Sequence, residues 1–333
     1  MKKLSLFMLA VIFIFALFAC EDASTDESQA SVESQLQESE ASSKESADSQ
    51  AESDVESSAE PDPDAILTAE EMIEIEEITA VTKNEQYSRS DAYVYNIEFV
   101  SDGLKLNAQL ALPANYEANN YPTVIYLPDI GYDEGFLIEN FAYKKVNVIR
   151  LFSRGAKGNE GMKDVCGEDF SDTELILKFC RESDFLSRGG IAVAGSSEGS
   201  IHALKLAAKH SSELIGCVVS QTLCDIEKAC EEREQSKQFF EYFLGGSFDE
   251  VPEEYKKRSA IYYADEIKVP VLIICYKDTE ERPTKYQAEA LKSALDAAGG
   301  NGEIYNIDVS YSDFNGTAFM KFIPWIKALA EAK

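Results

Sequence analysis

Residues 195–199, with the sequence Gly-Ser-Ser-Glu-Gly, constrain the fold of this chain more than any other feature. They follow the apolar run 191–194 and precede the Ala- and Leu-rich stretch 200–210, which predicts a buried strand, a sharp turn and a helix. Such a turn strains the backbone of its central residue, Ser197, and the flanking glycines remove Cβ atoms that would clash with the strand and the helix. We expect the Ser197 hydroxyl to stand at the carboxyl end of a sheet as a candidate nucleophile, with the backbone N–H of Glu198 as a candidate oxyanion donor.

Short apolar runs alternate with helical patterns through much of the chain. Residues 93–100 and 104–112 flank Ser101-Asp102-Gly103, which predicts an antiparallel hairpin. Further runs fit buried strands of a parallel sheet: residues 123–127, 146–149, 191–194, 215–220, 269–275 and 304–309. Residues 223–244 are expected to form a helical insertion above this sheet. The order predicts an α/β fold with a mostly parallel central sheet, helices on both faces and an antiparallel N-terminal hairpin.

The first twenty residues are typical of a secretion signal. Lys2 and Lys3 precede an apolar run, residues 4–19, that is shorter than the about 20 residues of a comfortable membrane span. The run ends in Leu-Phe-Ala before Cys20, which resembles the lipobox of bacterial lipoproteins, whose cysteine thiol is lipidated. We expect residues 1–20 to be a signal peptide and a lipid on Cys20 to anchor the protein to the extracellular face of a bacterial membrane. The alternative, an uncleaved anchor helix, gives the same topology.

Residues 21–65 are acidic and rich in serine. Fifteen Asp and Glu residues stand against the single Lys44, and large apolar side chains are almost absent. Such a segment cannot bury enough apolar surface to offset the entropy of ordering, so we expect a disordered stalk. Residues 66–91 are expected to form a short helix and a linker, and residues 92–333 the main domain. The formal net charge of −29, without a basic patch among aromatic residues, argues against a nucleic-acid partner.

Three further segments carry a family resemblance. Residues 153–161 (Ser-Arg-Gly-Ala-Lys-Gly-Asn-Glu-Gly) look like a Gly-rich loop that follows a central strand. Residues 256–264 and 267–274 match a stretch that leads into an acid-bearing strand. With the Gly-Ser-Ser-Glu-Gly turn, these segments resemble the α/β-hydrolase fold, and more narrowly the catalytic domain of prolyl oligopeptidase and related small esterases, over about residues 92–330. The resemblance implies a serine peptidase or esterase.

The resemblance assigns candidate roles to residues of this chain. It places the nucleophile at Ser197 and the triad acid at Asp278. It places the oxyanion donors at the backbone N–H groups of Glu198 and Ile130, although Pro-Asp-Ile-Gly stands here where the family has His-Gly. The carboxylates of Asp129 and Glu198, if near Ser197, would oppose an oxyanion by about 1 to 4 kcal/mol.

The triad histidine is missing from its expected place. In the loop after residues 304–309, Ser312 or Asp313 occupies the position. Without an imidazole, Ser197 has no suitable base, because carboxylates with pKa values near 4 accept a hydroxyl proton poorly. Activity is therefore expected to be weak or lost.

The chain contains two histidines, and both follow the pentapeptide on one predicted helix. His202 leaves the helix axis about 140° away from the direction of Ser197, so it is expected to point into helix packing. His210 is expected to complement the helix dipole at the carboxyl end. Two histidines eight residues apart do not share a face with an identifiable third ligand, so we expect no metal site, and no cofactor is implied.

Six cysteines remain besides Cys20: Cys166, Cys180, Cys217, Cys224, Cys230 and Cys275. An even number outside the cytoplasm permits three disulfides, but the spacing selects no pairing. Cys217 and Cys275 fall in predicted core strands and are expected to be small buried side chains.

Two functional classes fit these observations. The first is a serine hydrolase of weak or lost activity, and the second is a non-catalytic binding domain derived from a hydrolase. Acidic and aromatic groups near the expected pocket, among them Asp129 and Tyr132, favour a cationic or amine-bearing ligand in the second case. A third interpretation is a structural envelope protein whose stalk is the working part. The expected partners are the membrane, through the lipid on Cys20, and a peptide, an ester or a cationic small molecule.

Overall fold

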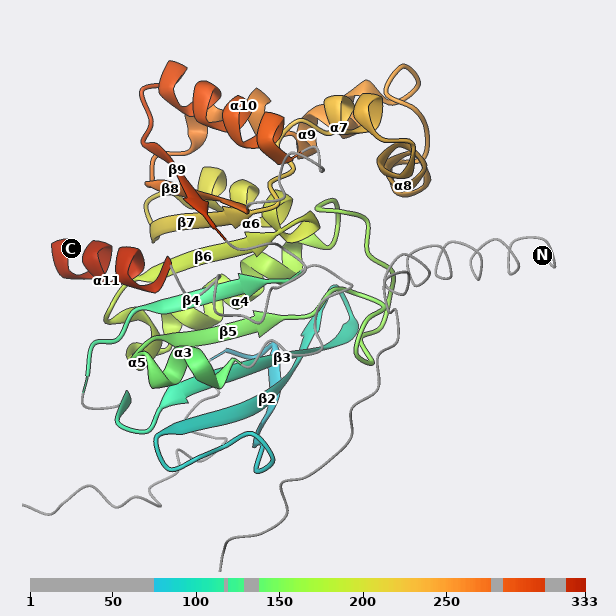
Figure 1. The fold of residues 1–333 in the computed structure, drawn as a ribbon. Coiled ribbons are helices and arrows are strands. Elements are labelled where there is room, and N and C mark those ends of the chain that lie inside the picture. Colours follow the sequence, from blue (N-terminus) through green and yellow to red (C-terminus); the bar gives the residue numbers. More distant parts are fainter. Residues whose placement is uncertain (1–74, 117–118, 129–137, 277–283, 309–321) are drawn as a thin grey trace, which may run out of the picture. The chain divides into compact units, whose positions relative to one another are not determined.

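A mixed sheet forms the framework of the computed structural model (Figure 1), which describes residues 75–116, 119–128, 138–276, 284–308 and 322–333. These residues all belong to one compact unit, Ala59–Lys333. Within them the sheet has nine strands in the order β1-β2-β3-β5-β4-β6-β7-β8-β9. The antiparallel strands come first in the chain and the parallel strands follow, which confirms the predicted fold class.

The predicted hairpin is formed by β2 (Ala92–Ser101) and β3 (Leu104–Pro113). Its two-residue turn consists of Asp102 and Gly103, whose φ angles are 51° and 78°. Positive φ at both turn positions matches the right-handed twist of the flanking strands, which is why a short polar residue and a glycine stand there.

One strand of the sheet was missed in the sequence. β1 (Ile78–Lys83) pairs antiparallel with β2, so the sheet begins within residues 66–91, where a helix and a linker were expected. The pairing register shifts between Ile78 and Ala80. This irregularity breaks the alternation of apolar and polar residues by which a strand is recognised.

The remaining strands follow the predicted runs closely. They are β4 (Thr123–Leu127), β5 (Asn147–Leu151), β6 (Ile191–Ser196), β7 (Leu214–Ser220), β8 (Val271–Tyr276) and β9 (Gly302–Ile307). β5 joins the two parts of the sheet, because it pairs antiparallel with β3 and parallel with β4. Every residue of β4, β5, β6 and β8 is buried, as expected for strands that helices cover on both faces.

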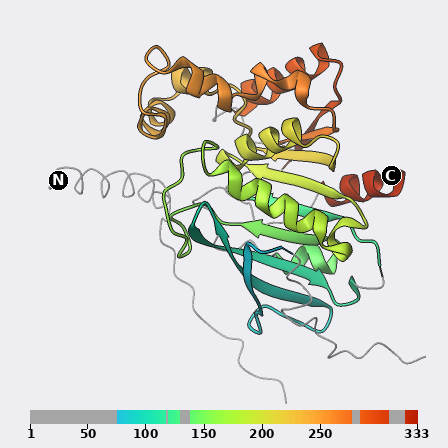
Figure 2. The ribbon, with the colours of Figure 1, turned by 180° about the vertical axis from the view of Figure 1, so that it is seen from behind.

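Helices pack on both faces of the sheet. α3 (Glu139–Tyr143) and α11 (Ile323–Ala332) contribute buried side chains to the core on one face. α4 (Phe170–Glu182), α6 (Glu198–Lys209) and α10 (Thr284–Ala297) contribute to the core on the other face, which Figure 2 presents. The short α5 (Asp184–Ser187) follows α4.

The predicted helical insertion follows β7. It contains α7 (Ile226–Glu232) and α8 (Glu234–Leu244), which pack against each other (Figure 1), and it continues into α9 (Pro252–Arg258). Two 3-10 turns, Ala260–Tyr262 and Ala264–Glu266, lead from α9 toward β8. α8 ends at Gly245, whose φ of 82° is the left-handed conformation that terminates many helices.

All six cysteines after Cys20 are free, so none of the permitted disulfides forms. Cys217 and Cys275 are buried in β7 and β8, which confirms their expected role as small core side chains. None of the helices in the described ranges is both long enough and apolar enough to cross a membrane.

Candidate functional site

Ser197 lies at the turn between β6 and α6, and its backbone is strained. Its φ of 51° and ψ of −120° are far from ordinary strand or helix values, as predicted for the centre of this turn. The Ser197 N–H donates to the carbonyl oxygen of Ser220 at the end of β7, at 3.0 Å. Ser197 is a half-buried residue at the carboxyl end of β6.

The two glycines of the pentapeptide are required by close backbone packing. A Cβ atom on Gly195 would overlap the carbonyl oxygen of Gly199, and a Cβ atom on Gly199 would overlap the carbonyl oxygen of Leu127 in β4. The backbone at the start of α6 therefore packs in direct contact with the backbone at the ends of β6 and β4. This close approach fixes the direction in which the Ser197 side chain and the Glu198 N–H point.

Several predicted site residues lie outside the described residues: Cys20, Asp129, Ile130, Tyr132, Asp278, Ser312 and Asp313. Of the residues predicted for the site itself, the structure describes Ser197 and Glu198, which it holds at the amino-terminal end of α6.

Both histidines bond to groups other than Ser197. His202 Nδ1 lies 3.2 Å from Thr173 Oγ1, and its Nε2 lies 3.7 Å from Asp169 Oδ1. The ring nitrogens of His210 lie 2.7 Å from carboxylate oxygens of Glu213 and Glu174. Each imidazole is thus engaged in packing between helices or at a helix end. Burial lowers the pKa of His202 to about 4, so this ring is neutral at physiological pH.

The Glu198 carboxylate forms an ion pair that the sequence did not reveal. Lys163 Nζ donates to Glu198 Oε2 at 2.7 Å, and the side chains of Lys163 and Glu198 are only 13% and 11% exposed. The negative charge that was expected to oppose an oxyanion next to Ser197 is therefore offset by an ammonium group. Lys163 is 35 residues upstream in an irregular loop, where no periodic pattern indicates its partner.

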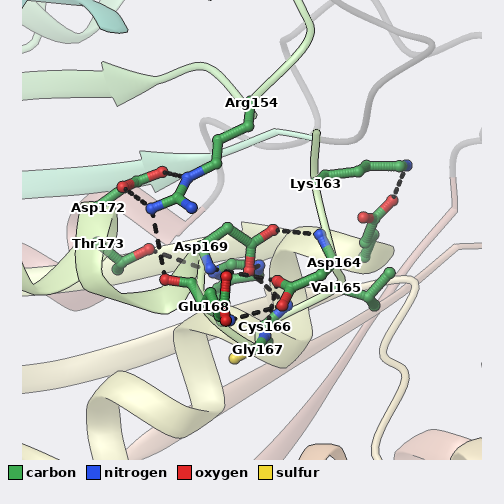
Figure 3. A network of polar contacts seen from close by, with 12 residues as sticks. Arg154, Lys163, Asp164, Val165, Cys166, Gly167, Glu168, Asp169, Asp172 and Thr173 are labelled. Carbon is green, nitrogen blue, oxygen red and sulfur yellow. Dashed lines mark hydrogen bonds and ion pairs between the residues drawn. The ribbon is translucent and has the colours of Figure 1, made fainter. Parts of the chain in front are cut away.

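A second ion pair anchors the Gly-rich loop, residues 153–161. Arg154 binds Asp172 of α4 through two hydrogen bonds, Nε to Oδ2 at 2.8 Å and Nη2 to Oδ1 at 2.7 Å (Figure 3). Arg154 Nη2 also donates to Asp102 of the β2–β3 turn at 2.7 Å. The Arg154 and Asp172 side chains are 5% and 4% exposed. The loop is thereby tied to a helix and to the hairpin.

A tight acidic turn lies between this loop and α4. Asp169 accepts hydrogen bonds from the N–H groups of Cys166 at 2.9 Å and of Asp164 at 3.0 Å (Figure 3). Asp164 in turn accepts from the N–H groups of Gly167 and Glu168, at 3.0 and 2.6 Å. These bonds hold Val165 and Cys166 at φ values of 59° and 69°, a left-handed conformation that is costly for a β-branched residue.

The two carboxyl groups of this turn titrate in opposite directions. Burial, together with the neighbouring Asp164, raises the pKa of Asp169 to about 8. Burial also raises the pKa of Asp164, but hydrogen bonds from Asp169 and from backbone N–H groups outweigh it and bring that pKa to about 2. The turn therefore holds one proton at neutral pH. A cavity of about 30 Å³, enough for a water molecule, lies between Asp169, Arg154 and His202.

This titration predicts a pH dependence of stability. Asp169 is ionised above about pH 4 in the unfolded chain but keeps its proton to about pH 8 when folded, so its contribution is lost as pH rises from 4 to 8. The pKa of His202 is about 4 in the folded protein and 6.5 in the unfolded chain. Its pH dependence is therefore opposite to that of Asp169, because the stabilising contribution of His202 is lost as pH falls from 6.5 to 4. The two effects oppose each other between pH 4 and 6.5, so a net loss of stability is expected as pH rises from 6.5 to 8.

Urea unfolding of the wild type and of Asp169→Asn at pH 6.5, 7.2 and 8.0 measures this slope. The Asn variant cannot release a proton at residue 169, so its unfolding free energy should change much less over this range, whatever its absolute stability. Equal slopes in the two proteins would contradict a protonated Asp169.

Within the described ranges, no group of three or more His, Cys, Asp and Glu side chains is placed to hold a metal ion. The site as described consists of a strained serine at a helix start, an adjacent carboxylate neutralised by Lys163, and two engaged imidazoles. Such a serine needs a group that takes its proton before it can attack a carbonyl carbon.

Comparison with known proteins gives the following likenesses. No protein-family model matches the chain. The uncharacterized peptidase YtmA of Bacillus subtilis is 29% identical over 185 residues, which cover 54% of this chain and 71% of that protein. Acetyl xylan esterase 1 of Thermoanaerobacterium sp. superposes with a TM-score of 0.58 at 16% identity, over 78% of this chain and 90% of that chain. Acylaminoacyl peptidase of Pyrococcus horikoshii superposes with a TM-score of 0.59 at 17% identity, over 77% of this chain and 42% of that chain.

At these identities the solved structures establish the fold and leave the activity open. Their likeness agrees with the strand order, the antiparallel N-terminal strands and the strained turn at Ser197. The chain therefore has the α/β-hydrolase fold and is similar to peptidases and an esterase built on that fold.

Proposed function

We propose that this protein is a serine hydrolase of the peptidase or esterase type whose turnover is weak or lost, with Ser197 as nucleophile and Asp278 as triad acid. The observation that carries the proposal is the contrast at Ser197 itself. Its strained backbone, with φ of 51°, is the conformation that exposes a nucleophile, whereas both imidazoles of the chain bond elsewhere. The nucleophile is retained and its usual base is missing.

The oxyanion donors in this proposal are the backbone N–H groups of Glu198 and Ile130. The ion pair between Lys163 and Glu198 supports the first of them, because it removes most of the repulsion that a bare carboxylate would exert on an oxyanion. Residual acceleration without the triad histidine rests on these donors and on substrate binding, and amounts to about 10³- to 10⁴-fold over the reaction in water.

We further propose that the protein is a lipoprotein held on the extracellular face of a bacterial membrane by a lipid on Cys20, with residues 21–65 as a flexible tether. The proposal is supported by the charged and apolar sequence before Cys20 and by the acidic, serine-rich composition that follows it. A peptide or an ester is the substrate class that the similar proteins favour.

Labelling with a fluorophosphonate probe tests the proposed nucleophile. We expect slow labelling of the wild type, at least about 10³-fold slower than that of an intact serine hydrolase in parallel, because no imidazole activates the hydroxyl. Mass spectrometry should place the label on Ser197, and Ser197→Ala should not be labelled. Labelling as fast as in the intact enzyme would contradict the loss of the base, and complete absence of labelling would favour a pure binding role.

The second candidate function is non-catalytic binding of a cationic ligand, with Asp129 and Tyr132 among its contacts. A specific observation favours it. The Glu198 carboxylate, next to Ser197 in the chain, already binds an ammonium group in this structure, that of Lys163.

A further inference from the structure

The ammonium group of Lys163 is held by three groups from two helices. Its Nζ donates to Glu198 Oε2 at 2.7 Å, and it lies 4.7 Å from the ring centroid of Phe239 and 4.9 Å from that of Phe243. Among the described residues, Glu198 is the hydrogen-bond acceptor for this ammonium. A carboxylate and two aromatic faces around one cation form the kind of site in which proteins bind the charged groups of ligands.

The carboxylate and the two rings of this site belong to helices and not to the loop that carries Lys163. Glu198 is fixed in the first turn of α6, directly after the strained Ser197. Phe239 and Phe243 are four residues apart on α8, so they lie on the same face of that helix, and their rings contact each other at 4.8 Å between centroids. The carboxylate and the two rings would keep their places if another ammonium group took the position of Nζ.

We propose that Glu198, Phe239 and Phe243 form a binding site for the ammonium group of an amine-bearing ligand, and that the Lys163 side chain occupies this site in the resting protein. The inference rests on the proposed binding role near Ser197 and names its ligand class, a primary alkylammonium such as the free amino group of a peptide. Because Glu198 follows Ser197 directly, a ligand held here by its amino group lies beside the strained turn.

Because Lys163 occupies the site, it competes with any ligand that binds there. A tethered side chain competes with an effective concentration in the millimolar range, so a free amine must displace it and binds the wild type more weakly than a variant without the lysine. The segment that carries Lys163 lies at the surface, since the preceding Met162 is 59% exposed. Displacement therefore moves the side chain of one residue in a surface segment, although that side chain is itself only 13% exposed in the resting protein.

The test uses the full-length protein with Lys163→Ala and n-butylammonium chloride, a free amine with the four carbons and the ammonium group of a lysine side chain. We expect a lower melting temperature for the variant and a saturable rise on addition of n-butylammonium. Half of this rise should occur at an amine concentration at least about tenfold below that needed for any shift of the wild type. The neutral 1-butanol should have no such effect, and Lys144→Ala, which removes an exposed lysine elsewhere, should behave like the wild type.

Lys163→Ala with Glu198→Gln provides the decisive control, because it removes the carboxylate that the amine needs. An equal response of this double variant, or an equal response to 1-butanol, would overturn the proposal. If Lys163→Ala does not fold, Lys163→Met keeps the apolar stem, and methylammonium takes the place of n-butylammonium with the same expected outcomes. The readout is a melting temperature and is repeated with Ser197→Ala, so its result does not depend on whether Ser197 is reactive.

Discussion

Replacing Arg154 with alanine is expected to destabilise the domain by about 3 to 5 kcal/mol, because the substitution leaves the Asp172 carboxylate buried without its counter-charge. Asp172 is 4% exposed and receives two hydrogen bonds from the guanidinium group of Arg154, so water cannot readily replace that partner. Loss of the contact to Asp102 contributes less to this destabilisation, because the Asp102 side chain is 53% exposed.

Arg188→Ala is the matched control for this prediction. Arg188 pairs with Asp184 through a similar two-contact arrangement, but the two side chains are 35% and 73% exposed. Its loss should cost less than about 1 kcal/mol. Urea unfolding of the wild type and both variants gives the comparison, and Arg154→Ala with Asp172→Ala should cost less than the sum of the single substitutions. Equal, small effects of Arg154→Ala and Arg188→Ala would show that the buried pair is not important for stability.

Local patterns made much of this fold predictable from the sequence. The run 123–127 coincides with β4 because its flanks are polar or proline and all five side chains are buried. The hairpin was recognisable because Asp102 and Gly103 suit the two positive φ angles of its turn. The turn at Ser197 was predictable for the same reason, since Gly195 and Gly199 are required by contacts within a few residues or with the neighbouring strand.

Features that depend on distant partners were missed. β1 is specified by its pairing with β2, and its own alternation is interrupted by a register shift. Lys163 is a single lysine in an irregular loop, and its role is set by Glu198 and by the aromatic residues of α8, at least 35 residues away. The left-handed Val165 runs against its intrinsic preference, because hydrogen bonds to Asp164 and Asp169 hold the turn around it.

The helical insertion was predicted in part. Residues 223–244 were predicted to be a helical insertion, and the structure confirms this as two helices that meet at Arg233. Asp225 starts the first of them by accepting the N–H of Lys228 at 3.1 Å, a cap with a recognisable sequence signal. Phe239 and Phe243 are four residues apart, which indicates that they share a helix face. The same spacing gives no indication that Lys163 lies against that face.

Gly199→Ala is expected to destabilise the domain by about 3 kcal/mol or more. At an ordinary helix position this substitution would be favourable by about 1 kcal/mol, because alanine restricts the unfolded chain and has the higher helix propensity. Here the added Cβ would overlap the carbonyl oxygen of Leu127, and the overlapping atom belongs to the backbone of β4, which cannot rotate away as a side chain could. α6 must then separate from the sheet, and the unfavourable term exceeds the gain in helix propensity.

Gly246→Ala is the matched control, because the nearest atom to its added Cβ is the flexible carboxylate end of Glu250, at 3.1 Å. That substitution should change the unfolding free energy by less than about 1 kcal/mol. Urea unfolding midpoints of the three proteins measure the difference, and fluorophosphonate labelling of any folded Gly199→Ala should be slower than in the wild type, because the Ser197 hydroxyl and the Glu198 N–H move with the start of α6. A Gly199→Ala variant that unfolds at the wild-type urea concentration would show that α6 does not approach β4 as closely as the backbone contact at Leu127 requires.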